Sequence, residues 1–267
     1  MFNSNQTVLL FVFTVIMIVC CVILLFTRSQ VTSTPPVYCL MVTGYSDKRR
    51  PFALRSVSNF LEQQYQNKHL IILNQSKSKL LKKNQTFDNI LEFYVNNEDK
   101  TLGYLRNISL RFVPPNAIWT TWDDDDWRHP SYLSTLMKRM FDTKTDFLML
   151  RNRIEYNLNN SFAYKSTLKT GFMTFFSKYD DNLRYDDVST SEDANVKGYA
   201  IKNMRYATYD NDAKLYIRLV HSDNTSVYVD GKKRSVNNTS KNKVYFETEL
   251  DKKERDFVDN IISKYYK

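Results

Sequence analysis

Apolar residues in the first half of the chain fall into short runs separated by amphipathic stretches. Buried strands are expected in three places: Tyr38 to Thr43, His69 to Leu73 and Leu91 to Val95. One helix is expected to begin at Pro51, and another to run from Leu102 to Phe112 before a strand that ends at Asp123. Strands that alternate with helices at this spacing predict an α/β fold with a mainly parallel sheet, which binds ligands at the carboxyl ends of its strands.

The second half of the chain is less regular. Four elements are expected there: a helix from Pro130 to Phe141 and strands near Phe147 to Arg151, Gly171 to Phe176 and Leu215 to Val220. The tail from Asp251 to Tyr266 predicts an amphipathic helix. Because its polar face mixes both signs of charge, we expect it to pack on the domain rather than to bind a membrane.

The N-terminal region contains a candidate membrane span. Val8 to Phe26 is nineteen residues without a charge, and as a helix it would be about 28 Å long, enough to cross the hydrocarbon core. A cleaved signal peptide would need a basic start, a shorter apolar run and a small-residue cleavage site, and none is evident. The expected organisation is a tail at residues 1–7, a signal anchor at 8–26, a stem at 27–37 and one domain at 38–267.

Two signals disagree about the orientation of this single-pass anchor. Residues 1–7 carry no Lys or Arg while Arg28 follows the span, and the positive-inside rule would then place the domain in the cytoplasm. Against this, N-x-S/T sequons, which are glycosylated only in the lumen, follow the span at seven positions: Asn74, Asn84, Asn107, Asn159, Asn224, Asn237 and Asn238. The two signals leave both orientations open.

Charge and cysteine content narrow the function classes. The formal net charge is +9, which suggests anionic partners. The Lys and Arg are scattered apart from short clusters such as Lys48-Arg49-Arg50, so we interpret most of them as solvated surface and expect no nucleic-acid partner. Cys39 is the one cysteine outside the apolar N-terminal segment, so neither a disulfide framework nor a zinc site is expected.

The sequence from Trp122 to Trp127 holds the strongest candidate chemistry, four consecutive carboxylates from Asp123 to Asp126. Four adjacent acids in a folded domain repel one another, and burial adds to the cost unless a cation is present. Oxygen ligands at a strand end suit Mg²⁺ or Mn²⁺. The alternative is a solvated acidic turn, but such a turn has no need of two flanking indoles.

These residues resemble a known family. The pattern D-x-D-D-W followed by Pro130 is similar to the signature of GT-A glycosyltransferases, most closely glycosyltransferase family 2. Further matches follow the family's order: Ala53 to Val57, Gln63 to Tyr65, Gly103 to Asn107, Glu192-Asp193 and Tyr216 to Thr225. The matches span Tyr38 to Thr225. One departure is Asn74-Gln75-Ser76, where the family has an aspartate pair that reads the nucleotide base; an amide can also hydrogen-bond a base edge.

The resemblance implies roles for individual residues. Asp125 would bind the metal directly, with Asp123 acting through water or on the ribose, Asp126 orienting the site and His221 as a further ligand. Asp193, with Glu192, would act as the catalytic base. The remaining donor-binding candidates are Thr43, Tyr45, Asn74, Arg106 and Asp124, with Arg106 directed at the diphosphate.

Each candidate outside the acidic run also has a structural interpretation. Glu192 and Asp193 could be first-turn acids of a helix, since acids are common there. His221 could be a structural histidine at a strand end, Arg106 a surface helix residue and Trp127 a core residue.

The sequence therefore predicts a membrane-anchored, divalent-metal-dependent inverting glycosyltransferase of the GT-A fold. It would move a hexose or N-acetylhexosamine from a nucleotide-diphosphate sugar, with UDP favoured, to a hydroxyl of a glycan, lipid or protein. The family resemblance favours a type II anchor with the domain in the Golgi or ER lumen. The alternatives are a metal-dependent phosphohydrolase or nucleotidyltransferase, and an inactive protein that binds sugar nucleotides.

Overall fold

The computed structural model describes residues 34–44, 47–76, 78–82, 87–95, 100–168, 174–211, 214–221 and 245–266. The chain divides into two compact units, Met1–Pro35 and Pro36–Lys267. The expected membrane span at 8–26 and the donor-binding candidate Tyr45 lie outside the described residues. Within those ranges, no helix is both long enough and apolar enough to cross a membrane.

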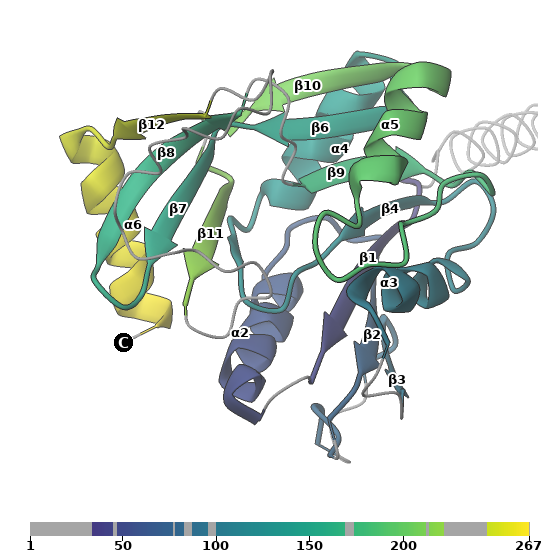
Figure 1. Cartoon of the computed structure of the whole chain (residues 1–267), viewed down its shortest axis with the longest axis horizontal. Coiled ribbons are helices and arrows are strands. Elements are labelled where there is room, and N and C mark those ends of the chain that lie inside the picture. The colour runs from purple at the N-terminus through teal and green to yellow at the C-terminus, as the bar shows by residue number, and fades with distance from the viewer. Residues whose placement is uncertain are drawn as a thin grey trace, which may run out of the picture. The chain divides into compact units, whose positions relative to one another are not determined.

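The second unit is built on a seven-stranded sheet (Figure 1). In spatial order its strands are β10 (Tyr206–Asp210), β6 (Phe147–Arg151), β9 (Thr174–Lys178), β4 (Ile118–Thr121), β1 (Val37–Thr43), β2 (Lys68–Asn74) and β3 (Ile90–Tyr94). Only β9 runs antiparallel to its neighbours, β4 and β6, and the other pairs are parallel. The sheet is therefore mainly parallel, as the alternation of strands and helices predicted.

Helices cover both faces of this sheet because its strands are apolar on both sides. Helices α2 (Arg50–Leu61) and α4 (Tyr132–Asp142) pack with one set of alternating strand residues, such as Cys39 and Met41 of β1. Helices α3 (Leu102–Leu110) and α5 (Ala194–Asn203) pack on the other face, where Leu40 of β1 points. Strands covered on both faces consist of nearly continuous apolar residues. This pattern predicted β1 and β2 from the sequence.

A second sheet of five strands was not expected from the sequence. Its spatial order is β12 (Tyr245–Glu249), β8 (Phe162–Leu168), β7 (Arg153–Asn157), β11 (Tyr216–Val220) and β5 (Trp127–Arg128). The strand expected near Leu215 to Val220 is β11 of this sheet. Helix α6 (Lys252–Tyr265) packs its Val258 and Ile262 against the sheet, as expected for the tail (Figure 1).

The start of α6 also follows from its sequence. The Asp251 side chain accepts a hydrogen bond from the backbone N–H of Glu254, and the Glu254 side chain accepts one from the N–H of Asp251, which forms a capping box.

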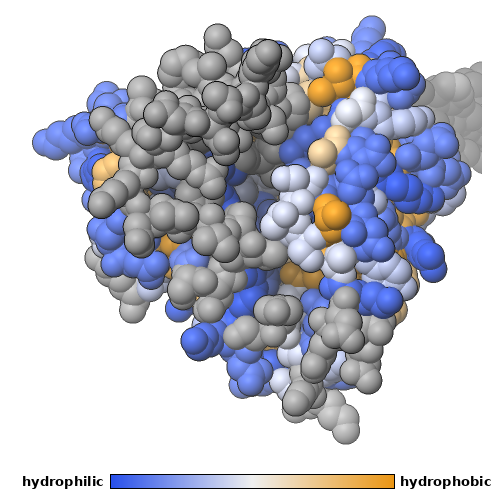
Figure 2. All heavy atoms as spheres, viewed as in Figure 1, coloured by the Kyte–Doolittle hydropathy of each residue, from blue (hydrophilic) through white to orange (hydrophobic). Residues whose placement is uncertain are grey.

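On the face shown in Figure 2, the coloured surface is mostly hydrophilic with isolated apolar spots. This agrees with the interpretation of most scattered Lys and Arg as solvated.

Candidate active site

The acidic run lies where the resemblance places it, at the carboxyl end of β4 and beside the carboxyl end of β1. The strand continues through Trp122, whose N–H donates to the carbonyl of Leu40 at 2.9 Å. The Trp122 indole is fully buried and packs edge-on against Phe60 at a centroid distance of 5.7 Å. Trp127 is also buried and packs against Phe257 of α6, so it is a core residue. Two buried indoles hold the ends of the run, which is not a solvated turn.

Ser56 of α2 and Gln63, which follows the C-terminal end of α2, anchor the loop that carries the acidic run. The Ser56 hydroxyl donates to the carbonyl of Asp123 at 3.1 Å. The Gln63 amide donates to the carbonyl of His129 at 2.9 Å and accepts from the N–H of Leu133 at 3.1 Å, which joins the loop to the start of α4. These contacts give a physical reason for the serine and glutamine in the segments that resemble the family.

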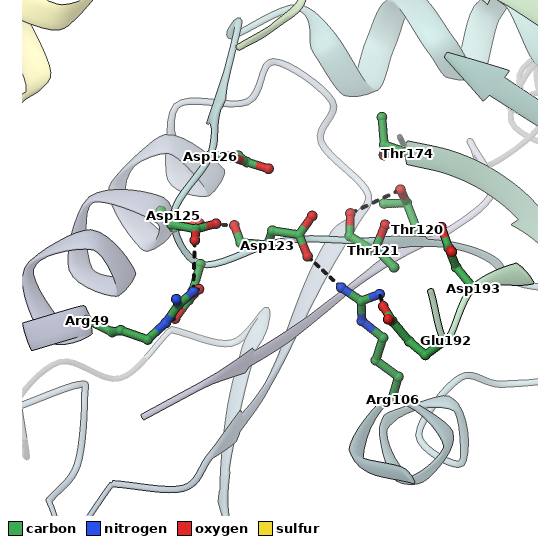
Figure 3. A network of polar contacts seen from close by, with 12 residues as sticks. Arg49, Arg106, Thr120, Thr121, Asp123, Asp125, Asp126, Thr174, Glu192 and Asp193 are labelled. Atoms are coloured by element: carbon green, nitrogen blue, oxygen red, sulfur yellow. Dashed lines mark hydrogen bonds and ion pairs between the residues drawn. The ribbon is translucent and has the colours of Figure 1, made fainter. Parts of the chain in front are cut away.

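The four carboxylates meet different partners, and Figure 3 shows Asp123, Asp125 and Asp126 pointing in different directions. Asp124 accepts a hydrogen bond from the Thr43 hydroxyl at 2.6 Å and pairs with the Arg49 guanidinium. Asp125 Oδ2 lies 2.9 Å from Arg49 Nη2 and 3.2 Å from His221 Nε2. Thr43, Asp124, Asp125 and His221, all candidates from the sequence, are therefore brought together.

The outer two acids of the run face other elements. Asp126 accepts a hydrogen bond from the Tyr216 hydroxyl and another, at 3.0 Å, from the N–H of Leu219. Asp123 Oδ1 lies 2.7 Å from Arg106 Nη2, on the side of α3 (Figure 3). Asp126 is thus held by β11 of the second sheet, whereas Asp123 is held by Arg106 of α3.

A buried arginine supports the run from within the core. Arg128 has 0% exposure, and its guanidinium carbon lies 4.2 Å from the centroid of Trp122 and 5.4 Å from that of Tyr216. One guanidinium nitrogen donates to the carbonyl of Asp123 at 3.3 Å. Its backbone N–H and carbonyl both bond the side-chain amide of Asn59. This is a cation in an aromatic cage directly behind four acids.

The arginines weaken the argument that burial of the acidic run requires a metal ion. A buried acidic run requires positive charge, and Arg49, Arg106 and Arg128 supply it from the protein itself. Arg49 is an exception to the interpretation of most Lys and Arg as solvated surface, since its side chain is only 11% exposed. A divalent ion is therefore not needed to make the run foldable, and any metal would serve the chemistry instead.

The acids do not titrate alike. Burial raises the pKa of Asp124, and the Arg49 guanidinium opposes that shift. Burial also pushes the pKa of Asp125 upward, but the hydrogen bond from His221 and the charge of Arg49 outweigh it and hold this pKa below its usual value. Burial together with the charges of Asp125 and Asp123 raises the pKa of Asp126 to about 7. The run therefore carries fewer than four negative charges near neutral pH.

The donor atoms fit one metal ion only in part. Within the ranges that the structure describes, no group of three or more His, Cys, Asp and Glu side chains is placed to hold a metal. Asp125 and His221 offer an oxygen and a nitrogen 3.2 Å apart, a pair that suits one divalent ion completed by diphosphate oxygens and water. Asp123 points to Arg106 instead, and its expected part in the metal site stays a prediction.

The acidic pair Glu192-Asp193 lies at the end of the loop before α5, near Asp123 (Figure 3). Glu192 pairs with Arg106, and burial raises the pKa of Glu192. Asp193 is the N-cap residue of α5, but its side chain makes no capping hydrogen bond and pairs with Lys197. The side chain of Asp193 is 25% exposed against 9% for Glu192, so Asp193 is the more accessible of the two acids.

The side-chain amide of Asn74 is buried and already makes three hydrogen bonds within the fold. Its Nδ2 donates to Glu92 at 2.6 Å and to the carbonyl of Ser78 at 3.0 Å, and its Oδ1 accepts from the N–H of Ser76 at 2.8 Å. A methyl group at Gly44, whose φ is +95°, would lie 2.5 Å from that Oδ1. Asn74 therefore shapes the loop after β2, and base recognition by its side chain would require these bonds to exchange.

Sequence reasoning identified the acids but missed their partners Arg49, Arg128 and Lys197. Arg49 had a usable signal, because it closely follows β1 and so lies at the same carboxyl edge of the sheet as the acids. Arg128 follows the acidic run directly, but nothing in the sequence indicates that its guanidinium turns into the core.

The comparison with known proteins rests on structure. No protein-family model matches the sequence, and no curated protein matches it. Several solved structures of TarS from S. aureus are similar to this chain. The complex with UDP-GlcNAc is 12% identical over 73% of this chain, with a TM-score of 0.56. The fold is of the GT-A type.

A second match, the TarS complex with UDP, is 13% identical over 69% of this chain, with a TM-score of 0.53. This chain spans 62% of the length of the first TarS structure and 60% of the second. At this identity the likeness establishes the fold, and the expected GT-A architecture is confirmed.

Proposed function

We propose that this protein is a glycosyltransferase of the family 2 type that moves a sugar from a UDP-sugar to an acceptor hydroxyl with inversion. The fold supports a nucleotide-sugar transferase, and the TarS neighbours were solved with UDP-GlcNAc and with UDP. The single observation that carries the proposal is the arrangement at the edge of the sheet. A run of carboxylates and a separate acidic pair, far apart in sequence, meet there through Arg106.

Donor and acceptor functions divide between the two acidic sites. Thr43, Asp124 and Asp125 lie at the carboxyl ends of β1 and β4, where parallel sheets bind ligands, and would hold the donor. Asp193 is the base in this proposal, taking the proton from the acceptor hydroxyl as its oxygen attacks the sugar. Glu192 is the less accessible acid and, paired with Arg106, supports the loop that carries Asp193.

We further propose that the reaction uses one Mn²⁺ or Mg²⁺ held by Asp125 and His221. When bound, such an ion offsets the charge that develops on the leaving diphosphate. The divergence of the four carboxylates favours this arrangement over a two-metal hydrolase, which directs several acids at shared ions. The anchor at residues 8–26 and a lumenal domain complete the proposal, on the sequence grounds given above.

A panel of nucleotide sugars tests the proposed function. The full-length chain in detergent, supplied with Mn²⁺, should release UDP from one UDP-sugar at a slow rate even without an acceptor, because water can replace the acceptor hydroxyl. An Asp193→Asn variant serves as the control for contaminating activity. If no nucleotide sugar is turned over while a phosphodiester is cleaved, the hydrolase alternative replaces this proposal.

A further inference from the structure

The first turns of α3 are built around the loop that carries the acidic pair. Gly103 packs so closely on this loop that a methyl group there would lie 1.8 Å from the carbonyl oxygen of Asp186. Its N–H donates to the carbonyl of Val188 at 3.0 Å. Only glycine leaves room for this approach, so the residue fixes the distance between helix and loop.

Asn107, one turn further along α3, holds the same loop through its backbone. Its Nδ2 donates to the carbonyl of Tyr185 and its Oδ1 accepts from the N–H of Tyr185, both at 2.9 Å. The loop closes on itself where the N–H of Asp186 donates to the carbonyl of Glu192 at 2.9 Å. Glycine and asparagine together clamp residues 185–192 to the helix, without any contact to the acidic run.

Arg106 lies between these two residues and joins the clamp to the run (Figure 3). One guanidinium nitrogen pairs with Glu192, the other lies 2.7 Å from Asp123, and the guanidinium carbon is 5.5 Å from the ring centroid of Tyr185. The side chain is 13% exposed. A planar fork that already binds two carboxylates is suited to fixing their separation, and less suited to gripping a diphosphate.

We propose that Arg106 is a positioning residue and not a donor ligand, and that the Gly103–Asn107 segment couples the donor site to the base. Through Arg106 and the clamp, the Asp123 side of the site and the Glu192-Asp193 loop keep one fixed spacing. The inference rests on the proposed function, since it assumes that Asp193 acts on the acceptor. It assigns a physical role to Gly103, Arg106 and Asn107 of the segment that resembles the family.

Two variants break the coupling in different ways and should share one phenotype. Arg106→Gln removes the bridge, whereas Gly103→Ala displaces the loop without removing any charge. Both should lower UDP release from the UDP-sugar by about 100-fold, the cost of misplacing a catalytic group by about 1 Å, and leave the affinity for UDP with Mn²⁺ almost unchanged by calorimetry. Amide exchange at Tyr185 and Gly103 should accelerate in both.

Matched controls are available in the same chain. Arg111→Gln removes an exposed arginine at the end of α3, and Gly198→Ala adds a methyl group where nothing lies within 4 Å. Both controls should retain turnover and exchange rates. Arg106→Lys keeps the charge but loses the fork and should behave like Arg106→Gln, which covers the case in which the glutamine variant does not fold.

The outcomes separate this inference from the proposed function. If Arg106→Gln weakens UDP affinity more than about tenfold while Gly103→Ala does not, Arg106 is a donor ligand and the inference fails. Normal turnover in Gly103→Ala would also overturn it. If the parent protein itself neither binds UDP nor releases it from any nucleotide sugar, the proposed function fails first and takes the inference with it.

Discussion

Arg128 shows at the scale of a single residue how the acidic run is tolerated. Its counter-charges are buried, and its guanidinium lies within an aromatic cage that includes Trp122 and Tyr216. Arg128→Met should therefore lower the free energy of unfolding by about 1–3 kcal/mol, because it removes a buried positive charge close to Asp126 and the hydrogen bond to the Asp123 carbonyl. Urea denaturation of the full chain measures the change. Arg111→Gln, at an exposed site, should stay within about 0.5 kcal/mol of the parent.

A loss below about 1 kcal/mol in Arg128→Met would contradict this account, since the residue would then act only by filling space.

Some residues of the acidic site could be predicted from the sequence. Four successive acids between indoles indicate a site on their own. The pairing of Asp124 with Arg49 was harder to predict, because Arg49 comes from 75 residues away in sequence and only its place shortly after β1 indicates it.

At the scale of secondary structure, every strand of the first sheet except β10 was expected from the sequence, whereas β11 was the only strand of the second sheet that was. Strands β1, β2 and β6 are apolar on both faces, so they appear as continuous apolar runs. In β7 the buried positions include Arg153 and Glu155, which pair with each other. In a sequence, charged residues at such positions are typical of loops, and their burial here is explained by the ion pair together with Tyr164 and Arg218, which also contact Glu155.

Asp146 provides a second prediction at this scale, because it ties three elements together just before β6. It pairs with Arg205, which precedes β10, and with Lys178 at the end of β9. The hydrogen bond from Arg205 outweighs partial burial and, with Lys178, lowers the pKa of Asp146 to about 2. Asp146→Asn should lower stability at pH 7 by about 1 kcal/mol or less, since both partners are exposed.

The sign of the pH dependence follows from that shift. The folded pKa of Asp146 lies below the unfolded value, so its ionised form stabilises the fold above about pH 4, and this stabilisation is lost as the pH falls toward 2. Urea midpoints of parent and Asp146→Asn should therefore differ at pH 7 and converge near pH 2. A constant difference over this range would show that the charge of Asp146 is not responsible.

At the scale of the whole molecule, the sequons test the proposed orientation. Asn159 is exposed in the turn between β7 and β8 and should carry a glycan if the domain is lumenal. The amides of Asn74 and Asn107 are bound within the fold and should carry none. Asn84, Asn237 and Asn238 are further expected acceptors, and Asn224 is expected to stay unmodified; these four lie outside the described residues.

Expression in eukaryotic cells followed by endoglycosidase treatment detects the modification. A lumenal domain predicts a mobility shift that Asn159→Gln reduces, whereas Asn107→Gln is expected to impair folding without changing the glycan count. Absence of any shift, together with protease access from the cytosol, would reverse the orientation and favour the charge rule over the sequons.

The central claim is that two acidic sites on a GT-A-type fold divide donor binding from base catalysis. The most direct test is a paired measurement of UDP affinity with Mn²⁺ and of UDP release from the UDP-sugar, in the parent and in two variants. Asp125→Ala should lose affinity and turnover together. Asp193→Asn should keep the affinity and lose turnover by about 10² to 10⁴-fold. Parent-like turnover in Asp193→Asn, or loss of UDP binding in that variant, would contradict the account.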